Sequence, residues 1–289
     1  NVTYFFDTLR TLGDGHVFNM QSDTLTFTGT AGNDSMIGLD TRGDIIEGLV
    51  GSDTIHSYGG DDVLIGGTGN DSLYGGLGDD SYVFSVGDSS GGDTISENAN
   101  EGTDAVVLHG VDPGDVHLWT TNNSTGLHIT YSATDNIVIA GGSFNNTNGV
   151  TIGSVEQIKF DDGTTWDLTG GLHLTANTST ATVYGTGFDD TIEGGSGSNT
   201  LYGYGGDDLL TGHAGNDNLN GGQGDDSYAF AVGDGSDTIN ETADQGTDTV
   251  LLHGVDPNDV HLWTANNSTS LPIASSATDD IAIAGGSFN

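Results

Sequence analysis

Aspartate recurs every nine residues in two blocks of this sequence, each time after a glycine-rich turn. The unit reads Gly-Gly-x-Gly-x-Asp-x-U-x, where U is a large apolar residue, as in Gly66 to Tyr74. Units start at Gly29, Leu39, Gly48, Ser57, Gly66 and Gly75, then at Gly185, Gly194, Gly203, Gly212 and Gly221. Their sixth positions are Asp34, Asp44, Asp53, Asp62, Asp71 and Asp80, then Asp190, Asn199, Asp208, Asp217 and Asp226. Carboxylate and turn carbonyl oxygens are the ligands that Ca²⁺ prefers, so we expect these residues to bind calcium.

The rest of each unit predicts how the carboxylates are positioned. Glycine reaches positive φ without steric cost, so the first five residues can turn sharply and aim their carbonyls inward. The three residues around U then extend as a short strand. U is Met36, Ile46, Ile55, Leu64, Leu73 and Tyr82, then Ile192, Leu201, Leu210, Leu219 and Tyr228. One large apolar side chain in every unit predicts a thin, stacked core rather than a thick one.

Charge supports a bound cation and argues against several other partners. Asp and Glu total 42 against 3 Lys and Arg, which gives a formal net charge of −39. Such a chain resists compaction unless positive charge is bound, and the regular spacing of the acids favours a folded site over disorder. Nucleic acid and anionic membranes are poor partners for it. There is no cysteine, and no apolar run is long enough for a membrane span.

A longer repeat overlies the short one. Residues 75–145 match 221–289 at most positions, with a two-residue deletion near Gly91. Between the blocks, alternating stretches such as Leu127-His128-Ile129 predict short strands, and no stretch predicts a long helix. We interpret the chain as a window from a longer tandem array of units of roughly 145 residues.

Other conspicuous residues favour structural roles. Tyr82 and Tyr228 are expected to close the core, and Trp119 and Trp263 to pack on strands. Asp7, Asp135 and Asp259 are expected on solvated surface. The histidines lack the HExxH spacing of a zinc enzyme; they include His109, His117, His253 and His261. We therefore expect no catalytic residues and no enzyme activity in this chain.

The nonapeptides over 29–84 and 185–230 resemble the RTX family, the haemolysin-type calcium-binding repeats of type I secreted bacterial proteins. This resemblance implies an all-β fold with two parallel β-roll solenoid blocks, alternating with β-rich, sandwich-like segments. The implied domains are the end of a preceding β-rich unit (1–28), β-roll 1 (29–84), a β-rich associated domain (85–168), a connector (169–184), β-roll 2 (185–230) and a truncated second β-rich domain (231–289). Apolar residues in the connector leave room for a further strand.

In the family two nonapeptides make one coil, so each ion lies between turns two units apart. The implied pairs are Asp34 with Asp53, Asp44 with Asp62, Asp53 with Asp71, Asp62 with Asp80, Asp190 with Asp208, Asn199 with Asp217, and Asp208 with Asp226. Weaker binding is expected at Asp44, because of an extra residue before Leu39 and Arg42 at a turn-glycine position, and likewise near Phe188 and at Asn199. An extension of each roll through Asp93 and Asp104, and through Asp237 and Asp248, is left open.

The resemblance implies a calcium-binding structural module of a large secreted or cell-surface bacterial protein, such as a surface-layer subunit, an adhesin or a matrix filament. Several calcium ions are the expected cofactors, further copies of the chain are possible partners, and the expected location is extracellular or at the cell surface. One alternative is the repeat region of a secreted protease, lipase or polysaccharide epimerase whose catalytic domain lies outside this chain. Another is an adhesin that binds carbohydrate or a host surface.

Overall fold

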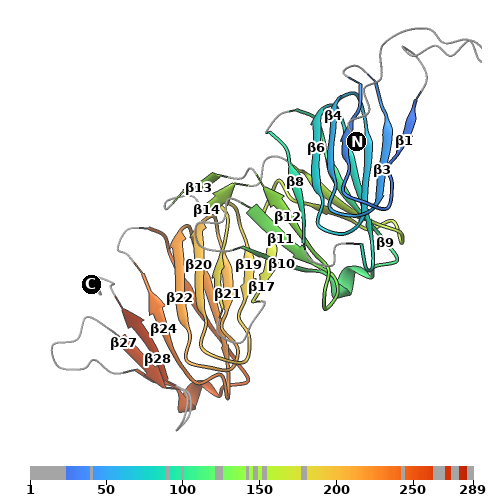
Figure 1. The fold of residues 1–289 in the computed structure, drawn as a ribbon. Helices are drawn as coiled ribbons and strands as arrows, with labels where there is room; N and C mark the ends of the chain where they lie inside the picture. Colours follow the sequence, from blue (N-terminus) through green and yellow to red (C-terminus); the bar gives the residue numbers. More distant parts are fainter. Residues whose placement is uncertain are drawn as a thin grey trace, which may run out of the picture. The chain divides into compact units, whose positions relative to one another are not determined.

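The computed structural model describes residues 24–39, 42–88, 92–98, 101–120, 126–140, 143–145, 149–151, 155–176, 181–241, 245–262, 271–274 and 280–284. Their regular structure is strand, apart from the short 3₁₀ segments Pro113–Asp115 and Pro257–Asp259. The all-β fold with a β-solenoid is therefore confirmed. Contacts divide the chain into two compact units, which Figure 1 colours from blue to green and mainly from yellow to red.

The first unit is residues 1–116, 127–142 and 152–169. One sheet has the order β1-β3-β5-β7-β9-β15-β16, and the other contains β2-β4-β6-β8-β12-β11. The strands are β1 (Thr26–Thr28), β2 (Ser35–Ile37), β3 (Ile45–Val50), β4 (Thr54–Gly59), β5 (Val63–Thr68), β6 (Ser72–Leu77), β7 (Ser81–Ser85), β8 (Asp93–Ser96), β9 (Ala105–His109), β11 (Gly126–Thr130), β12 (Asn136–Ala140), β15 (Gln157–Phe160) and β16 (Thr165–Asp167). Successive repeats thus alternate between two parallel sheets, as expected of a β-roll.

Two nonapeptides make one coil. Ile45 pairs with Val63, and Thr54 with Ser72, so each strand lies beside the strand that follows it two units later. Gly29 N donates to Glu47 O and Gly38 N to His56 O, both at 2.7 Å. Gly38 therefore occupies the first position of its unit. The predicted start at Leu39 is wrong by one residue, because the added residue lies inside the turn.

The core is a pair of apolar ladders. On one sheet Phe27, Ile46, Leu64, Tyr82, Val106 and Ile158 lie in register from coil to coil. On the other, Met36, Ile55, Leu73, Ile95 and Ile139 do the same. Ile46, Ile55, Leu64, Leu73 and Tyr82 are fully buried, which confirms the thin stacked core. Each such residue contributes about 1.5–3 kcal/mol through burial.

The second unit is residues 117–126, 143–151 and 170–289. One sheet contains β10-β17-β19-β21-β23-β25, another has the order β18-β20-β22-β24-β28-β27-β26, and β13 and β14 form a hairpin. The strands are β10 (His117–Thr120), β13 (Ser143–Asn145), β14 (Gly149–Thr151), β17 (His173–Thr175), β18 (Thr182–Tyr184), β19 (Thr191–Glu193), β20 (Thr200–Gly205), β21 (Leu209–Thr211), β22 (Asn218–Gln223), β23 (Ser227–Ala231), β24 (Ser236–Asn240), β25 (Thr249–His253), β26 (His261–Leu262), β27 (Leu271–Ala274) and β28 (Asp280–Ala284).

Both rolls have parallel coils beyond their nonapeptides. In the first unit β8, β9, β12 and β15 add to the two sheets in parallel, and in the second β24, β25 and β28 do so. Within residues 169–184, β17 and β18 pair with the first strands of the second block. The expected domain boundaries stay a prediction, and most of the expected 1–28 segment lies outside the described residues.

Candidate metal centres

The sixth-position side chains form a continuous ladder along each roll. The backbone N–H of one residue donates to a side-chain oxygen of the residue two units later, for example from Asp53 to Asp71 Oδ1 at 2.7 Å. The same bond joins all seven predicted pairs, with N···O distances from 2.6 to 2.9 Å. The two-unit spacing implied by the resemblance is therefore the spacing in the structure.

The ladder continues past the last nonapeptide of each block. Asp71 N donates to Asp93 Oδ1 at 2.7 Å and Asp80 N to Asp104 Oδ1 at 2.8 Å. In the second unit Asp217 N donates to Asp237 Oδ1 and Asp226 N to Asp248 Oδ1, at 2.8 and 3.1 Å. These four aspartates, whose role the sequence left open, therefore extend the carboxylate ladder.

Seven aspartates keep their second oxygen for another ligand. Their Oδ2 atoms are buried and accept no hydrogen bond from the described residues. They belong to Asp53, Asp62, Asp71, Asp80, Asp208, Asp217 and Asp226. Each is the C-terminal member of one predicted pair. A buried anionic oxygen without a donor is costly, so its presence in seven equivalent turns points to a bound cation.

Glycine leaves the space beside these oxygens. A Cβ at Gly203 would overlap Asp208 Oδ2 and lie 2.5 Å from the carbonyl oxygen of Gly221 in the next coil. At Gly48 the equivalent Cβ would meet Asp53 Oδ2 and, at 2.6 Å, the carbonyl oxygen of Gly66. Carboxylate and carbonyl oxygens of successive coils thus converge on one region. This all-oxygen donor set fits a hard cation such as Ca²⁺.

The backbone of these seven turns is left-handed at the second position of the unit. The residues there are Leu49 (φ 81°), Tyr58 (73°), Gly67 (91°), Gly76 (99°), Tyr204 (79°), His213 (61°) and Gly222 (112°). A non-glycine residue in this region costs about 1–2 kcal/mol. Such strain persists where the surrounding structure requires the conformation, often at a binding site.

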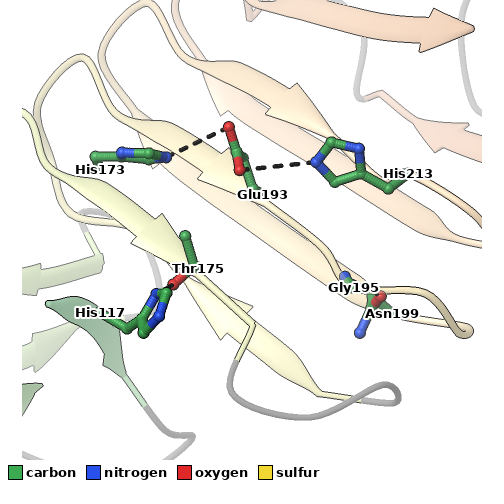
Figure 2. A network of polar contacts seen from close by, with 7 residues as sticks. All are labelled: His117, His173, Thr175, Glu193, Gly195, Asn199 and His213. Carbon is green, nitrogen blue, oxygen red and sulfur yellow. Dashed lines mark hydrogen bonds and ion pairs between the residues drawn. The ribbon is translucent and has the colours of Figure 1, made fainter. Parts of the chain in front are cut away.

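The other four sixth-position residues use their side chains differently. Asp34 Oδ2 accepts from Thr30 N at 2.6 Å, Asp44 Oδ2 from Leu39 N at 2.8 Å, and Asp190 Oδ2 from Thr186 N at 2.5 Å. Asn199 Oδ1 accepts from Gly195 N at 2.8 Å, and Figure 2 shows these two residues side by side. None of the four donor residues has positive φ. We call the first seven turns open and these four closed.

Burial raises the pKa of the open carboxylates. Desolvation, the largest cause, is reinforced by the neighbouring carboxylates of the ladder and opposed by the backbone hydrogen bonds. It raises the pKa of Asp80 to about 7 and that of Asp208 to about 9, and those of Asp62, Asp71 and Asp226 to about 6. These groups resist ionisation unless a cation lies nearby.

Fifth-position residues form a second ladder on the solvent side. Its hydrogen bonds run the other way, from the backbone N–H of the later unit to the carboxylate of the earlier one. Asp79 N donates to Asp61 Oδ1 at 3.0 Å and Asp225 N to Asp207 Oδ1 at 2.8 Å. Asp61 and Asp207 are exposed, whereas their neighbours Asp62 and Asp208 are buried. Adjacent aspartates in one unit therefore have different environments.

Each roll also contains an acidic group that the repeat pattern does not reveal. Tyr82 Oη donates to Glu97, whose carboxylate also accepts from Gly75 N at 2.6 Å and Gly76 N at 3.1 Å. The same tyrosine–glutamate contact joins Tyr228 and Glu241. Oxygens of Asp226, Glu241 and Asp248 lie within 4.8 Å of one another, close enough for a shared metal ion. The nonapeptide pattern does not predict these glutamates, because each lies more than a dozen residues from the tyrosine that it contacts.

Several other sequence expectations can be compared with the structure. Tyr82 and Tyr228 are buried core residues, as expected. Asp135 is not on solvated surface: it is 1% exposed and accepts from Gly87 N at 2.9 Å. Trp119 is half-buried on β10. Asp7 and Trp263 lie outside the described residues, and the side chain of Asp259 is not described.

The described histidines lie on the surface of the sheets or are half-buried. His109 is exposed and contacts Asp161 at 2.6 Å. In Figure 2, Glu193 on β19 lies between His173 on β17 and His213, at 3.4 and 3.7 Å. These three side chains are 38–61% exposed, and the two histidines contact different oxygens of the carboxylate. Glu193 therefore bridges the two histidines on the surface of the sheet.

Comparison with known proteins agrees with the geometry. The RTX calcium-binding nonapeptide repeat matches four times, over 39–71, 56–90, 184–219 and 193–228. The haemolysin-type calcium binding protein related domain matches 127–169. No curated protein matches the chain. A solved structure, the extracellular lipase LipA from Serratia marcescens, is 13% identical, with 93% of this chain and 39% of the lipase covered and a TM-score of 0.23.

The fold and the carboxylate ladder define a parallel β-roll whose turns bring carboxylate and carbonyl oxygens together. Both nonapeptide blocks are RTX haemolysin-type calcium-binding repeats, and a haemolysin-type related domain follows the first block. The sequence resemblance is thereby confirmed. Such repeats indicate a calcium-binding structural module. The chain spans 39% of the lipase's length, and a likeness at that TM-score supports no statement about function. None of the described residues forms a helix that could cross a bilayer.

Proposed function

We propose that this chain is a calcium-stabilised structural module of a large secreted or cell-surface bacterial protein, such as a surface-layer subunit, an adhesin or an extracellular matrix filament. It folds when calcium binds outside the cell. The observation that carries this proposal is the set of seven buried Oδ2 atoms at sixth positions of the nonapeptides, four in the first roll and three in the second. RTX repeat proteins are typically secreted, which supports the extracellular location.

Charge balance supports folding on calcium. Seven Ca²⁺ ions would bring 14 positive charges to a chain whose formal net charge is −39. Without them the carboxylates of successive coils repel one another across the ladder. Binding to the folded state alone stabilises that state, so calcium and folding are coupled.

The module performs no catalysis in this proposal. The acids in the turns are ligands of a repeated site, and repetition favours a scaffold. If the parent protein is a secreted enzyme, its catalytic domain lies outside this chain, and the sequence before Asn1 would distinguish an enzyme from a scaffold.

Assembly with further copies is part of the filament form of the proposal. Electron microscopy would then find calcium-dependent elongated particles, and compact particles at every calcium concentration would argue against it.

Calcium titration of the chelated chain, followed by circular dichroism, tests the central claim. We expect the β signal to appear with calcium and to collapse again in excess chelator. Magnesium serves as the control cation, because it requires near-octahedral geometry and dehydrates reluctantly. A chain equally folded in excess chelator would contradict the proposal.

A further inference from the structure

The four closed turns all belong to the first coil of a nonapeptide block. In the first roll they are the turns of Asp34 and Asp44, and in the second those of Asp190 and Asn199. Every later nonapeptide has an open turn. The nonapeptide turns therefore have two conformations, and the closed one occurs in the first coil of each block.

In the second roll the open and the closed turns stack on different kinds of coil. Asp208 receives a backbone bond from Asp190, which lies in a nonapeptide turn. Asp190 receives the equivalent bond from Leu172 at 2.7 Å, in a segment that is not a nonapeptide. Likewise Asn199 Nδ2 donates to Ala181 O at 3.2 Å. A cation held between two coils needs oxygen ligands from both. A coil that stacks on a segment without the nonapeptide has no sixth-position carboxylate beneath it.

Two of the closed turns also bind their own carboxylate through a threonine side chain. The hydroxyls of Thr30 and Thr186 add second hydrogen bonds, to Asp34 Oδ2 at 2.8 Å and Asp190 Oδ2 at 3.0 Å. Both threonines occupy the second position, where the motif has glycine. With the bond from Leu172, both oxygens of Asp190 accept backbone or hydroxyl donors.

Arg42 supplies a charge to the closed turn of Asp44. Its Nε lies 3.3 Å from Asp44 Oδ1, and the arginine side chain is only 8% exposed. The chain contains only 3 Lys and Arg residues. One of these rare cations is therefore buried against a sixth-position carboxylate. A guanidinium beside that carboxylate balances its charge without a metal ion.

We propose that the first coil of each roll, Gly29 to Glu47 and Gly185 to Tyr202, is a cap whose sixth-position side chains bind the chain itself rather than calcium. Calcium then binds between each of the seven open turns and the coil that follows it, with Asp53, Asp62, Asp71, Asp80, Asp208, Asp217 and Asp226 as its carboxylate ligands. Asp34, Asp44, Asp190 and Asn199 are positioning residues of the cap. This inference rests on the proposed calcium-binding function and reassigns four of the eleven predicted ligands.

Counting bound calcium in matched variants tests the cap. The full chain is equilibrated with calcium, and the ions bound per chain are measured by elemental analysis. We expect about seven for the unaltered chain, one for each open turn, and the same number for Asp190→Ala. Asp208→Ala, the equivalent change one coil later, should lose at least one ion. Asp34→Ala and Asp53→Ala form the same comparison in the first roll.

A gain of charge provides an independent measurement. Asn199→Asp restores the repeat consensus, and in a calcium-binding turn it would add an ion or raise the affinity. In a cap it leaves both the count and the calcium midpoint unchanged. Asp190→Asn and Asp208→Asn keep the side-chain volume and replace the alanine variants if those do not fold.

The outcomes separate the two proposals. A chain that binds no calcium contradicts the proposed function. A chain that binds calcium but loses as much with Asp190→Ala as with Asp208→Ala contradicts the cap alone. An additional ion in Asn199→Asp contradicts the cap in the same way.

Discussion

The backbone amide of Asp62 donates to Oδ1 of Asp80 at 2.8 Å, and Oδ2 of the same Asp80 side chain accepts no hydrogen bond from the described residues. One oxygen thus fixes the carboxylate to the previous coil, and the other remains for a cation. Because the first bond holds the side chain in place, little conformational entropy remains to be lost on binding. The same division of roles in seven turns makes the array of sites regular.

Adjacent aspartates of one unit should therefore respond differently to truncation. We expect Asp62→Ala to raise the calcium concentration at the folding midpoint at least several-fold, because it removes a buried carboxylate ligand. Asp61→Ala removes an exposed carboxylate one residue earlier and should change the midpoint little. Calcium titration followed by circular dichroism measures both, and equal effects would reject the assignment of the sixth position as the ligand.

Protons should partly replace calcium in the chelated protein. Burial raises the pKa of Asp80 to about 7 and that of Asp208 to about 9, from an ordinary value of 3.8. Between the ordinary pKa and these raised values, the folded chain therefore binds more protons than the unfolded chain. Any metal-free fold must lose stability as the pH rises from about 4 to about 9. Circular dichroism of the chelated chain across this range measures the trend, and a residual β signal that grows as the pH rises would contradict it.

Calcium should reverse that dependence, because protons and calcium compete for the same carboxylates. The calcium affinity of the unaltered chain should fall as the pH is lowered from about 9, the raised pKa of Asp208, to about 6, the raised pKa of Asp62 and Asp71. Calorimetric titration at two pH values, together with the protons released on binding, provides the measurement. An affinity independent of pH would show that these carboxylates are not the ligands.

The stacked core should be sensitive to single truncations. Leu64 is fully buried and lies in register with Ile46 and Tyr82, so Leu64→Ala should cost about 2–5 kcal/mol of unfolding free energy. Leu77 is 61% exposed, and Leu77→Ala should stay within about 0.5 kcal/mol. Urea unfolding in saturating calcium compares the two, and similar losses would contradict the ladder.

Replacing glycine should cost most stability where the backbone of an adjacent coil approaches closely. Gly67 and Gly87 both have positive φ, at 91° and 97°. A Cβ at Gly67 would overlap the carbonyl oxygen of Leu49, whereas nothing lies within 4 Å of a Cβ at Gly87. Gly87→Ala should cost about 1–2 kcal/mol from backbone strain, and Gly67→Ala clearly more. Unfolding in saturating calcium distinguishes them, and Gly67→Ala should also weaken calcium binding.

The nine-residue period was enough to predict the fold, the apolar ladders and the pairing of sixth-position residues. This is because the period fixes which residues stack, so Asp53 must lie beside Asp71 once two units make a coil. The period contains no information about the ends of the stack. Asp190 and Asp208 occupy the same position of the unit, but Thr186 precedes Asp190, and Leu172 rather than a sixth-position aspartate lies in the coil beneath it.

Contacts across longer distances account for the remaining differences. Asp135 is buried because Gly87, 48 residues earlier, donates to it. Glu97 reaches Gly75, 22 residues earlier, from outside the nonapeptides. Neither contact follows from a local pattern, since each depends on how the chain returns to the roll after a turn of irregular length.

The sixth-position ladder keeps its register although the chain between its members varies in length. Bonded residues are 18 apart for Asp53 and Asp71, 19 for Asp34 and Asp53, 22 for Asp71 and Asp93, and 24 for Asp80 and Asp104. The strands on either side stay in register, so the ladder does not depend on a fixed interval between its members. A change in length between coils should therefore leave the ladder intact, and these intervals offer a protein engineer places to graft foreign peptides onto an evenly spaced display.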